Sequence, residues 1–279
     1  MSRYVRPHSI DEALRALSSG ELSILAGGTD FYPGRVGTVA EEDILDITAI
    51  DELRGVQESE HGFRIGALTT WSDIAAAKLP PCFDCLKLAA REVGGLQIQN
   101  AATIVGNLCN ASPAADGVPP LLSLGAEVEL ARVDARRTLP LDQFITGNRR
   151  TRRAPGELVT AVHVPRWGAS ARSHFLKLGA RKYLVISIAM VSGVVEPDAR
   201  GMIARCAFAV GSCSTVAQRL PELERALIGT TIDGTLPDRV RPEHLVALAP
   251  ITDVRGTAEY RVDAALALVR RTLEVLAGE

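Results

Sequence analysis

The chain has 279 residues, of which 47% are hydrophobic and 23% charged, a balance that excludes disordered, collagen-like and coiled-coil chains. Its 31 Lys and Arg residues against 33 Asp and Glu give a net charge of −2. Nothing in that charge indicates a nucleic-acid binder, because such proteins usually carry a basic excess. At about 150 residues per domain, the length predicts two domains.

The first predicted element is a short capped helix over residues 9–18. Ser9 stands three positions before Glu12, which is a capping box, and apolar side chains share one helical face. A strand at 22–26 follows and leads directly into Gly27-Gly28. The remaining elements expected before residue 94 are strands at 44–47 and 63–65 and helices at 70–77 and 86–93, with Pro80-Pro81 between the helices.

Residues 94–120 have a different composition. They are rich in Gly, Asn, Ser, Thr and Pro, and Asp116 is their only charged residue. A solvated surface loop normally carries more charge, so we expect an ordered and partly buried loop. Long ordered loops inside compact domains are often functional.

The second half predicts strands followed by helices, an order typical of an α+β protein. A domain boundary is expected near 166–173, where a three-strand-plus-helices pattern begins. The elements expected after residue 120 are strands at 126–133, 158–164, 175–178, 184–195 and 203–210, an Arg-rich turn at 149–153 and a last helix at 258–276.

The sequence shows no signal peptide, no membrane-spanning stretch and none of the common catalytic motifs. The N-terminus lacks the apolar core of a signal peptide, and the longest apolar stretch, 183–195, is too short to span a bilayer. Five irregularly spaced cysteines favour reduced thiols and a cytoplasmic protein. We find no G-x-G-x-x-G, P-loop, H-E-x-x-H or G-x-S-x-G motif, which argues against Rossmann, P-loop, zincin and α/β-hydrolase enzymes.

Two small-residue loops carry the strongest functional signal. One is Ala26-Gly27-Gly28-Thr29-Asp30, and the other spans 103–113, with Asp116 just beyond it. Glycines allow backbone N–H groups to converge on an anion, so two such loops suit a diphosphate, and Asp116 could accept from a ribose hydroxyl. For Gly27-Gly28 alone, a plain turn after a strand is an equal alternative.

Together these loops closely resemble the flavoprotein (medium) subunit of the molybdenum hydroxylases, the xanthine dehydrogenase and aerobic carbon monoxide dehydrogenase family. That family has A-G-G-[TS]-[DN] and T-I-G-G-N-x-x-x-A-S-P-x-x-D. Here the second loop reads T-I-V-G-N-L-C-N-A-S-P-A-A-D, with Val105 in place of the first glycine. The resemblance extends to about residue 210 through Gln97-Ile98-Gln99-Asn100, Phe144-x-x-Gly147, Arg150-Thr151, Glu157-Leu158-Val159 and Phe175-x-Lys177-x-x-x-Arg181.

The resemblance implies an α+β fold with two domains. The first, residues 1–168, is a two-lobed PCMH-type FAD-binding domain like those of vanillyl-alcohol oxidase and MurB, with lobes at about 1–55 and 56–168. The second, residues 169–279, is a small C-terminal α+β domain with a three-stranded sheet and helices. The implied cofactor is non-covalent FAD, with molybdopterin on a large partner subunit and [2Fe-2S] clusters on a small one, together a heterotrimer. The implied activity is electron transfer from those clusters through FAD to NAD⁺ or another acceptor.

The resemblance also assigns cofactor-binding positions. Phe31 is expected near the flavin ring, Asp116 at ribityl or ribose hydroxyls, Val159 along the flavin and Lys177 near the pyrimidine edge, where a cation suits the negative charge of reduced flavin. Cys109 is expected as a small packing residue of the second loop. The other positions are Ile24, Leu25, Ala26, Gly27, Gly28, Thr29 and Asp30 in the first loop, and Thr103, Gly106, Asn107, Asn110 and Ser112 in the second.

Several alternatives remain open. The chain could be a self-contained flavin oxidase or reductase on the same scaffold, or a scaffold that has lost flavin, for which Val105 is the visible support. Lys177 could be an exposed strand lysine. Cys82-x-x-Cys85 has metal-ligand or redox-pair spacing but lacks two nearby partners, so no metal is predicted. The arginines at 149–153 suit a solvated turn, or attraction of an acidic partner or of NAD.

Overall fold

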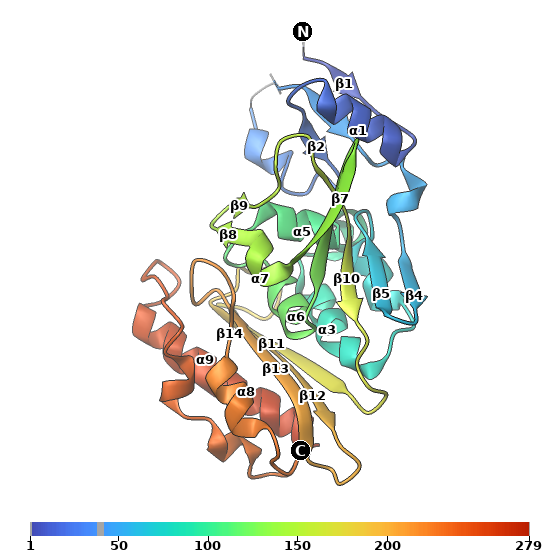
Figure 1. Cartoon of the computed structure of the whole chain (residues 1–279). Coiled ribbons are helices and arrows are strands. Elements are labelled where there is room, and N and C mark those ends of the chain that lie inside the picture. The colour runs from blue at the N-terminus through green and yellow to red at the C-terminus, as the bar shows by residue number, and fades with distance from the viewer. Residues whose placement is uncertain (1, 38–41, 279) are drawn as a thin grey trace.

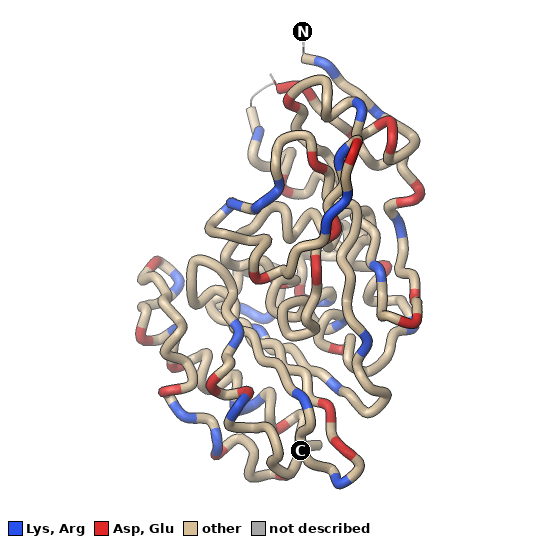
Figure 2. Tube along the Cα trace, in the orientation of Figure 1, with Lys and Arg blue, Asp and Glu red and all other residues tan. Residues whose placement is uncertain are grey.

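The structure is a computed structural model that describes residues 2–37 and 42–278. An N-terminal lobe, a central sheet and a C-terminal sheet with helices follow one another along its length (Figure 1). Figure 2 shows acidic and basic residues mixed over the whole trace. No helix in the described part of the chain is long and apolar enough to cross a membrane.

The N-terminal lobe is a small parallel sheet with one helix. Strands β1 (Tyr4–Val5), β3 (Ile44–Asp46) and β2 (Ser23–Leu25) pair in that order. Helix α1 (Ile10–Ser18) starts as predicted, because the Ser9 hydroxyl accepts from the Glu12 amide at 3.3 Å. Two 3₁₀ turns, η1 (Pro33–Arg35) and η2 (Asp51–Leu53), complete the lobe's connections.

The central sheet is antiparallel and has the order β4-β5-β10-β6-β7. Its middle strand, β10, comes after the other four strands in the sequence. The long segment between β5 and β6 forms the helices that accompany the sheet. The strands are β4 (Val56–Ser59), β5 (Gly62–Gly66), β6 (Glu127–Arg132), β7 (Ala135–Pro140) and β10 (Leu158–Pro165). The helices are α2 (Trp71–Ala76), η3 (Pro81–Phe83), α3 (Asp84–Glu92), α4 (Leu96–Ala101), α5 (Ile104–Asn110) and α6 (Val118–Ser123).

The expectation that 94–120 is one long loop was wrong, because α4, α5 and the start of α6 lie in it. Thr103 caps α5, since its hydroxyl accepts from the Gly106 amide at 3.0 Å. Burial of Ile104 and Leu108 then stabilises a helix whose Gly and Asn residues have low helix propensity. The expectation that this segment is ordered and partly buried was correct.

The C-terminal sheet is antiparallel, and successive side chains along its strands point alternately into two hydrophobic cores. Its strands are β11 (Arg172–Leu178), β12 (Ala189–Pro197), β13 (Ile203–Gly211) and β14 (Gln218–Arg219). Met190 and Val194 face one core together with α3 and α6, whereas Val191 and Val195 face the other with α9 (Ala258–Ala277). Both faces are therefore covered, which explains the nearly continuous apolar sequence of these strands.

Two details of this sheet correct the sequence prediction. It has four strands instead of three, because two-residue β14 adds an edge that no sequence pattern indicates. The strand expected at 184–195 begins only at Ala189. Leu184 adopts a left-handed φ of 53°, which a strand does not accommodate. Short elements complete the fold: α7 (Leu141–Phe144), β8 (Ile145–Gly147), β9 (Arg150–Thr151), α8 (Pro221–Leu227), η4 (Leu236–Arg239) and η5 (Pro242–Leu245).

Candidate functional site

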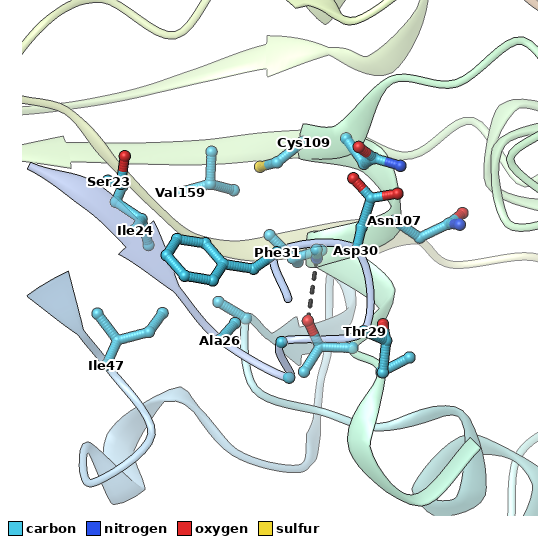
Figure 3. Close-up of a pocket in the computed structure, with 18 of the residues that line it drawn as sticks. Ser23, Ile24, Ala26, Thr29, Asp30, Phe31, Ile47, Asn107, Cys109 and Val159 are labelled. Carbon is cyan, nitrogen blue, oxygen red and sulfur yellow. Dashed lines mark hydrogen bonds between the residues drawn. The ribbon is translucent and has the colours of Figure 1, made fainter. Parts of the chain in front are cut away.

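A cavity of about 600 Å³ lies where the turn after β2, the helix α5 and the start of β10 meet. That volume is within the range of small-molecule and cofactor sites, about 300–1,000 Å³. Figure 3 shows side chains from these segments arranged around it. Thirteen of the predicted cofactor-binding residues line it: Ile24, Ala26, Gly27, Gly28, Thr29, Asp30, Phe31, Thr103, Gly106, Asn107, Cys109, Asn110 and Val159.

The first loop needs both of its glycines. A Cβ on Gly27 would lie 1.9 Å from the carbonyl oxygen of Ala101, so this turn packs directly on the backbone before α5. Gly28 has a left-handed φ of 73°, and a Cβ there would lie 2.7 Å from the Tyr32 ring. The lack of a side chain at Gly27 therefore allows the first loop to contact the segment before the second. The left-handed conformation of Gly28 turns the chain within the first loop.

The backbone amides of this loop are free to bind a ligand. Within residues 2–37 and 42–278, the N–H groups of Gly27, Gly28 and Thr29 have no hydrogen-bond acceptor. Successive free amides in a turn form a concave donor set that suits an anion. The loop thus supplies the donors that the sequence predicted for it.

The opposite wall is α5, whose geometry depends on two close contacts. A Cβ on Gly106 would lie 2.7 Å from the Thr103 hydroxyl oxygen, so glycine allows the cap to form. Asn107 Oδ1 accepts from the Gly117 amide at 3.1 Å, which fixes the amide side chain in the wall. Val105, where the family motif has glycine, is buried, and it lines the cavity instead of closing it.

The rest of the lining is largely apolar and includes a cation on an aromatic face. The Arg35 guanidinium carbon lies 3.7 Å from the centroid of the Phe31 ring. The indole N–H of buried Trp71 has no acceptor within the described residues. In Figure 3, Phe31 lies among Ile24, Ala26 and Val159. Apolar side chains of Leu22, Ile47, Val93, Ile98 and Leu158 also contribute. This wall suits a flat, largely apolar group.

Four predicted residues lie outside the lining: Leu25, Ser112, Asp116 and Lys177. Leu25 is buried in β2, and the Ser112 hydroxyl accepts from the Ala114 amide at 3.2 Å. The carboxylate of Asp116 accepts from Lys177 Nζ at 2.7 Å and from the Ser187 hydroxyl at 2.6 Å. Burial raises the pKa of Asp116, while Lys177 and Ser187 act against that rise.

The Asp116–Lys177 pair adjoins the cavity without facing it. Asp116 precedes Gly117, whose amide bonds to cavity-lining Asn107. Lys177 also donates to the carbonyl of Glu92 at 3.3 Å, next to cavity-lining Val93. Lys177 is thus buried, and the alternative of an exposed strand lysine is wrong.

Sequence reasoning missed several residues of the site. Arg35, Trp71 and Arg153 line the cavity, and Arg149 lies at its rim, where Nη1 is 2.9 Å from Asp30 Oδ2. The arginine cluster at 149–153 was visible in the sequence, but its nearness to the first loop was not. No motif marked Trp71.

The Cys82-x-x-Cys85 pair lies away from the cavity as buried thiols. Burial and the neighbouring Cys85 raise the pKa of Cys82 to about 12, which keeps that thiol protonated. In the part of the chain that the structure describes, no group of three or more His, Cys, Asp or Glu side chains is placed to hold a metal ion.

Comparisons with known proteins cover nearly the whole chain. Residues 1–167 match the model of the FAD binding domain in molybdopterin dehydrogenase, and residues 174–276 match that of the CO dehydrogenase flavoprotein C-terminal domain. The nicotine 6-hydroxylase medium subunit of Paenarthrobacter nicotinovorans is 30% identical, with 97% of this chain and 95% of the relative covered. The carbon monoxide dehydrogenase medium chain of Afipia carboxidovorans is also 30% identical, at the same coverage.

The similarity to solved structures also extends over the whole chain. A chain of reconstituted CO dehydrogenase from Oligotropha carboxidovorans superposes with a TM-score of 0.91 at 27% identity, and covers 100% of this chain and 98% of that one. Together these findings confirm the α+β class, with an FAD-binding domain followed by a C-terminal domain, that the sequence predicted.

Proposed function

Because the chain belongs to the family of FAD-binding medium subunits of molybdopterin dehydrogenases, we propose that it carries electrons from the [2Fe-2S] clusters of a small partner subunit to NAD⁺ or another acceptor. Family membership confirms the predicted oxidoreductase subunit that binds FAD. In this proposal a large molybdopterin subunit oxidises the substrate and supplies the electrons.

The observation that carries the proposal is the donor set of the first loop beside an apolar wall. Three free amides, of Gly27, Gly28 and Thr29, suit the anionic diphosphate of FAD. The wall around Ile24 and Val159 suits its ring systems. The cavity residues therefore fit FAD in both charge and polarity.

We assign the chain's own residues as follows. Gly27, Gly28 and Thr29 would bind the diphosphate, and Thr103, Gly106 and Asn107 would form the facing wall. Phe31, held under the Arg35 guanidinium, would border the flavin with Val159. When bound, FAD accepts electrons singly and releases them singly or in pairs, which suits a junction between clusters and a two-electron acceptor.

The remaining predicted residues would act through neighbours. Leu25 and Ser112 would support the two loops from behind. Asp116, held by Lys177, would position the adjoining Gly117, whose amide binds Asn107, and Lys177 would hold the end of α3 through the Glu92 carbonyl. Cys109 would fill space beside the cofactor.

We also propose domains at 1–168 and 169–279, with lobes of about 1–55 and 56–168 in the first. The matched ranges 1–167 and 174–276 support this division. So does the C-terminal sheet, one face of which packs on its own core. A cytoplasmic setting is supported by five cysteines that are all free thiols.

The test uses the complex captured through a tag on the full chain in its own cells. We expect iron, molybdenum and FAD to purify together. With the clusters chemically reduced under anaerobic conditions, adding NAD⁺ or a quinone should reoxidise them only when FAD is present, and FAD-stripped complex should stay reduced. Equal reoxidation without FAD would contradict the proposal. Reduction of the isolated chain's flavin by an organic substrate would favour a self-contained oxidase instead.

A further inference from the structure

The turn between β8 and β9 contains an arginine where the backbone favours glycine. Its two central residues are Asn148 and Arg149, and Arg149 has a left-handed φ of 54°. Glycine or asparagine is usual at such a position, because a Cβ makes this conformation unfavourable. An arginine in this conformation points to side-chain contacts that offset the strain.

The Arg149 guanidinium connects the two walls of the cavity. Nη1 donates to Asp30 Oδ2 at 2.9 Å and also to Asn110 Oδ1. Asp30 belongs to the first loop and Asn110 ends α5, and both line the cavity. One cationic group thus joins segments that approach the ligand from opposite sides.

The backbone of Arg149 is held against the end of α5. The Arg149 amide donates to the carbonyl of Ala111 at 2.8 Å. Ala111 is the C-cap of α5 and is itself left-handed, with a φ of 48°. Two non-glycine residues in unfavourable backbone conformations therefore hold the turn against the end of α5.

The charge of Arg149 also solves a problem that the first loop creates. The Asp30 carboxylate lies one residue beyond three free amides that suit an anion. An unpaired carboxylate there would repel a diphosphate. Arg149 neutralises it, and both side chains are more than half exposed, so salt would weaken the pairing.

We infer that Arg149 is a positioning residue for FAD, which neutralises Asp30 and ties the first loop to α5 at the cavity rim. The inference rests on the proposed FAD site. It assigns to Arg149 a role within this chain, where the sequence suggested for the arginines at 149–153 a solvated turn, or attraction of an acidic partner or of NAD.

The test measures the rate of FAD release from the full chain, followed by the fluorescence of freed FAD. Arg149→Gly removes the guanidinium and relieves the backbone, so the apoprotein should be at least as heat-stable as wild type. FAD release should nevertheless be about tenfold faster, equivalent to about 1.4 kcal/mol. Arg150→Ala, which removes an equal charge from the exposed neighbour, should release FAD at the wild-type rate.

The second variant separates charge from structure. Adding Asp30→Asn to Arg149→Gly removes the uncompensated carboxylate, so release should slow again toward the wild-type rate. Unchanged release in Arg149→Gly, or faster release with no recovery in the double variant, would overturn the inference. A wild-type chain that binds no FAD would instead overturn the proposed site, and the inference with it.

Discussion

Lys177 and Asp116 form a buried ion pair, 2.7 Å long, that joins strand β11 to the segment between α5 and α6. Only 5% of the lysine side chain and 11% of the aspartate side chain are exposed. Ser187, on the segment before β12, donates to the same carboxylate. The pair therefore connects the C-terminal sheet to the wall of the cofactor cavity.

Removing one partner of this pair should be costly. Lys177→Met leaves Asp116 buried without its cation, so we expect a loss of about 3–5 kcal/mol in the free energy of unfolding, measured in urea. Lys177→Met with Asp116→Leu should recover most of it, because no buried charge is left unpaired. Arg132→Met, which breaks the exposed pair with Asp134, should cost less than about 1 kcal/mol. Equal losses for the buried and exposed pairs would contradict this account.

Gly27→Ala should lower both FAD content and thermal stability. The added Cβ would lie 1.9 Å from the Ala101 carbonyl oxygen, so the first loop must move away from α5. The obstacle is thus the protein backbone just before α5. Gly20→Ala is the matched control, because a Cβ there meets nothing within 4 Å. Full FAD content in purified Gly27→Ala would show that loop contact is not needed for binding.

Cys109 should report directly on occupation of the cavity. It is the exposed one of the five cysteines, and Figure 3 shows its sulfur directed toward Val159. Although the residue is exposed, nearby protein atoms desolvate its thiol and raise the pKa to about 11, so labelling by N-ethylmaleimide should become faster as pH rises. We expect mass spectrometry to find one rapidly labelled thiol in the apoprotein, protected by FAD and absent in Cys109→Ser. Labelling at the same rate with FAD bound would place the cofactor elsewhere.

Glu129 should make the central sheet sensitive to acid. Burial opposes its ionisation, but hydrogen bonds from Arg64, Thr160 and His163 outweigh that effect and lower its pKa to about 2. Since the folded pKa lies below the ordinary 4.5, this carboxylate stabilises the fold above about pH 4.5, and the contribution is lost as pH falls toward 2.

The measurement is urea unfolding of wild type and Glu129→Gln at pH 7 and pH 3. The variant should be clearly less stable at pH 7, and the difference should narrow at pH 3. Glu127→Gln, at an exposed position of the same strand, should differ little from wild type at both. A difference for Glu129→Gln that does not change with pH would contradict the assignment.

Local signals predicted much of the fold because their partners are close in sequence. Ser9 and Thr70 cap helices through residues three positions away, and both helices start where predicted. Thr103 is the same kind of signal, but the Gly and Asn residues after it obscured α5. Burial of Ile104 and Leu108, which depends on distant strands, decides that segment.

The sequence predicted the parts of the site that lie in recognisable motifs. It did not predict contacts between residues that are far apart in the chain. The two loops converge on one cavity, as the diphosphate argument required. Asp116, in contrast, bonds to Lys177, 61 residues away, a contact created by packing of β11 on the FAD-binding part. Arg149 and Asp30 are 119 residues apart, so no spacing rule relates them.

The most direct test of the central claim is the visible spectrum of the purified chain, with identification of the cofactor released on denaturation. Wild type should carry one FAD per chain. Ile24→Trp, which fills the cavity from β2, should fold but lack flavin absorbance, whereas Val133→Trp, at an exposed position outside the cavity lining, should retain FAD. A colourless wild type that takes up no added FAD, or full FAD content in Ile24→Trp, would contradict the account.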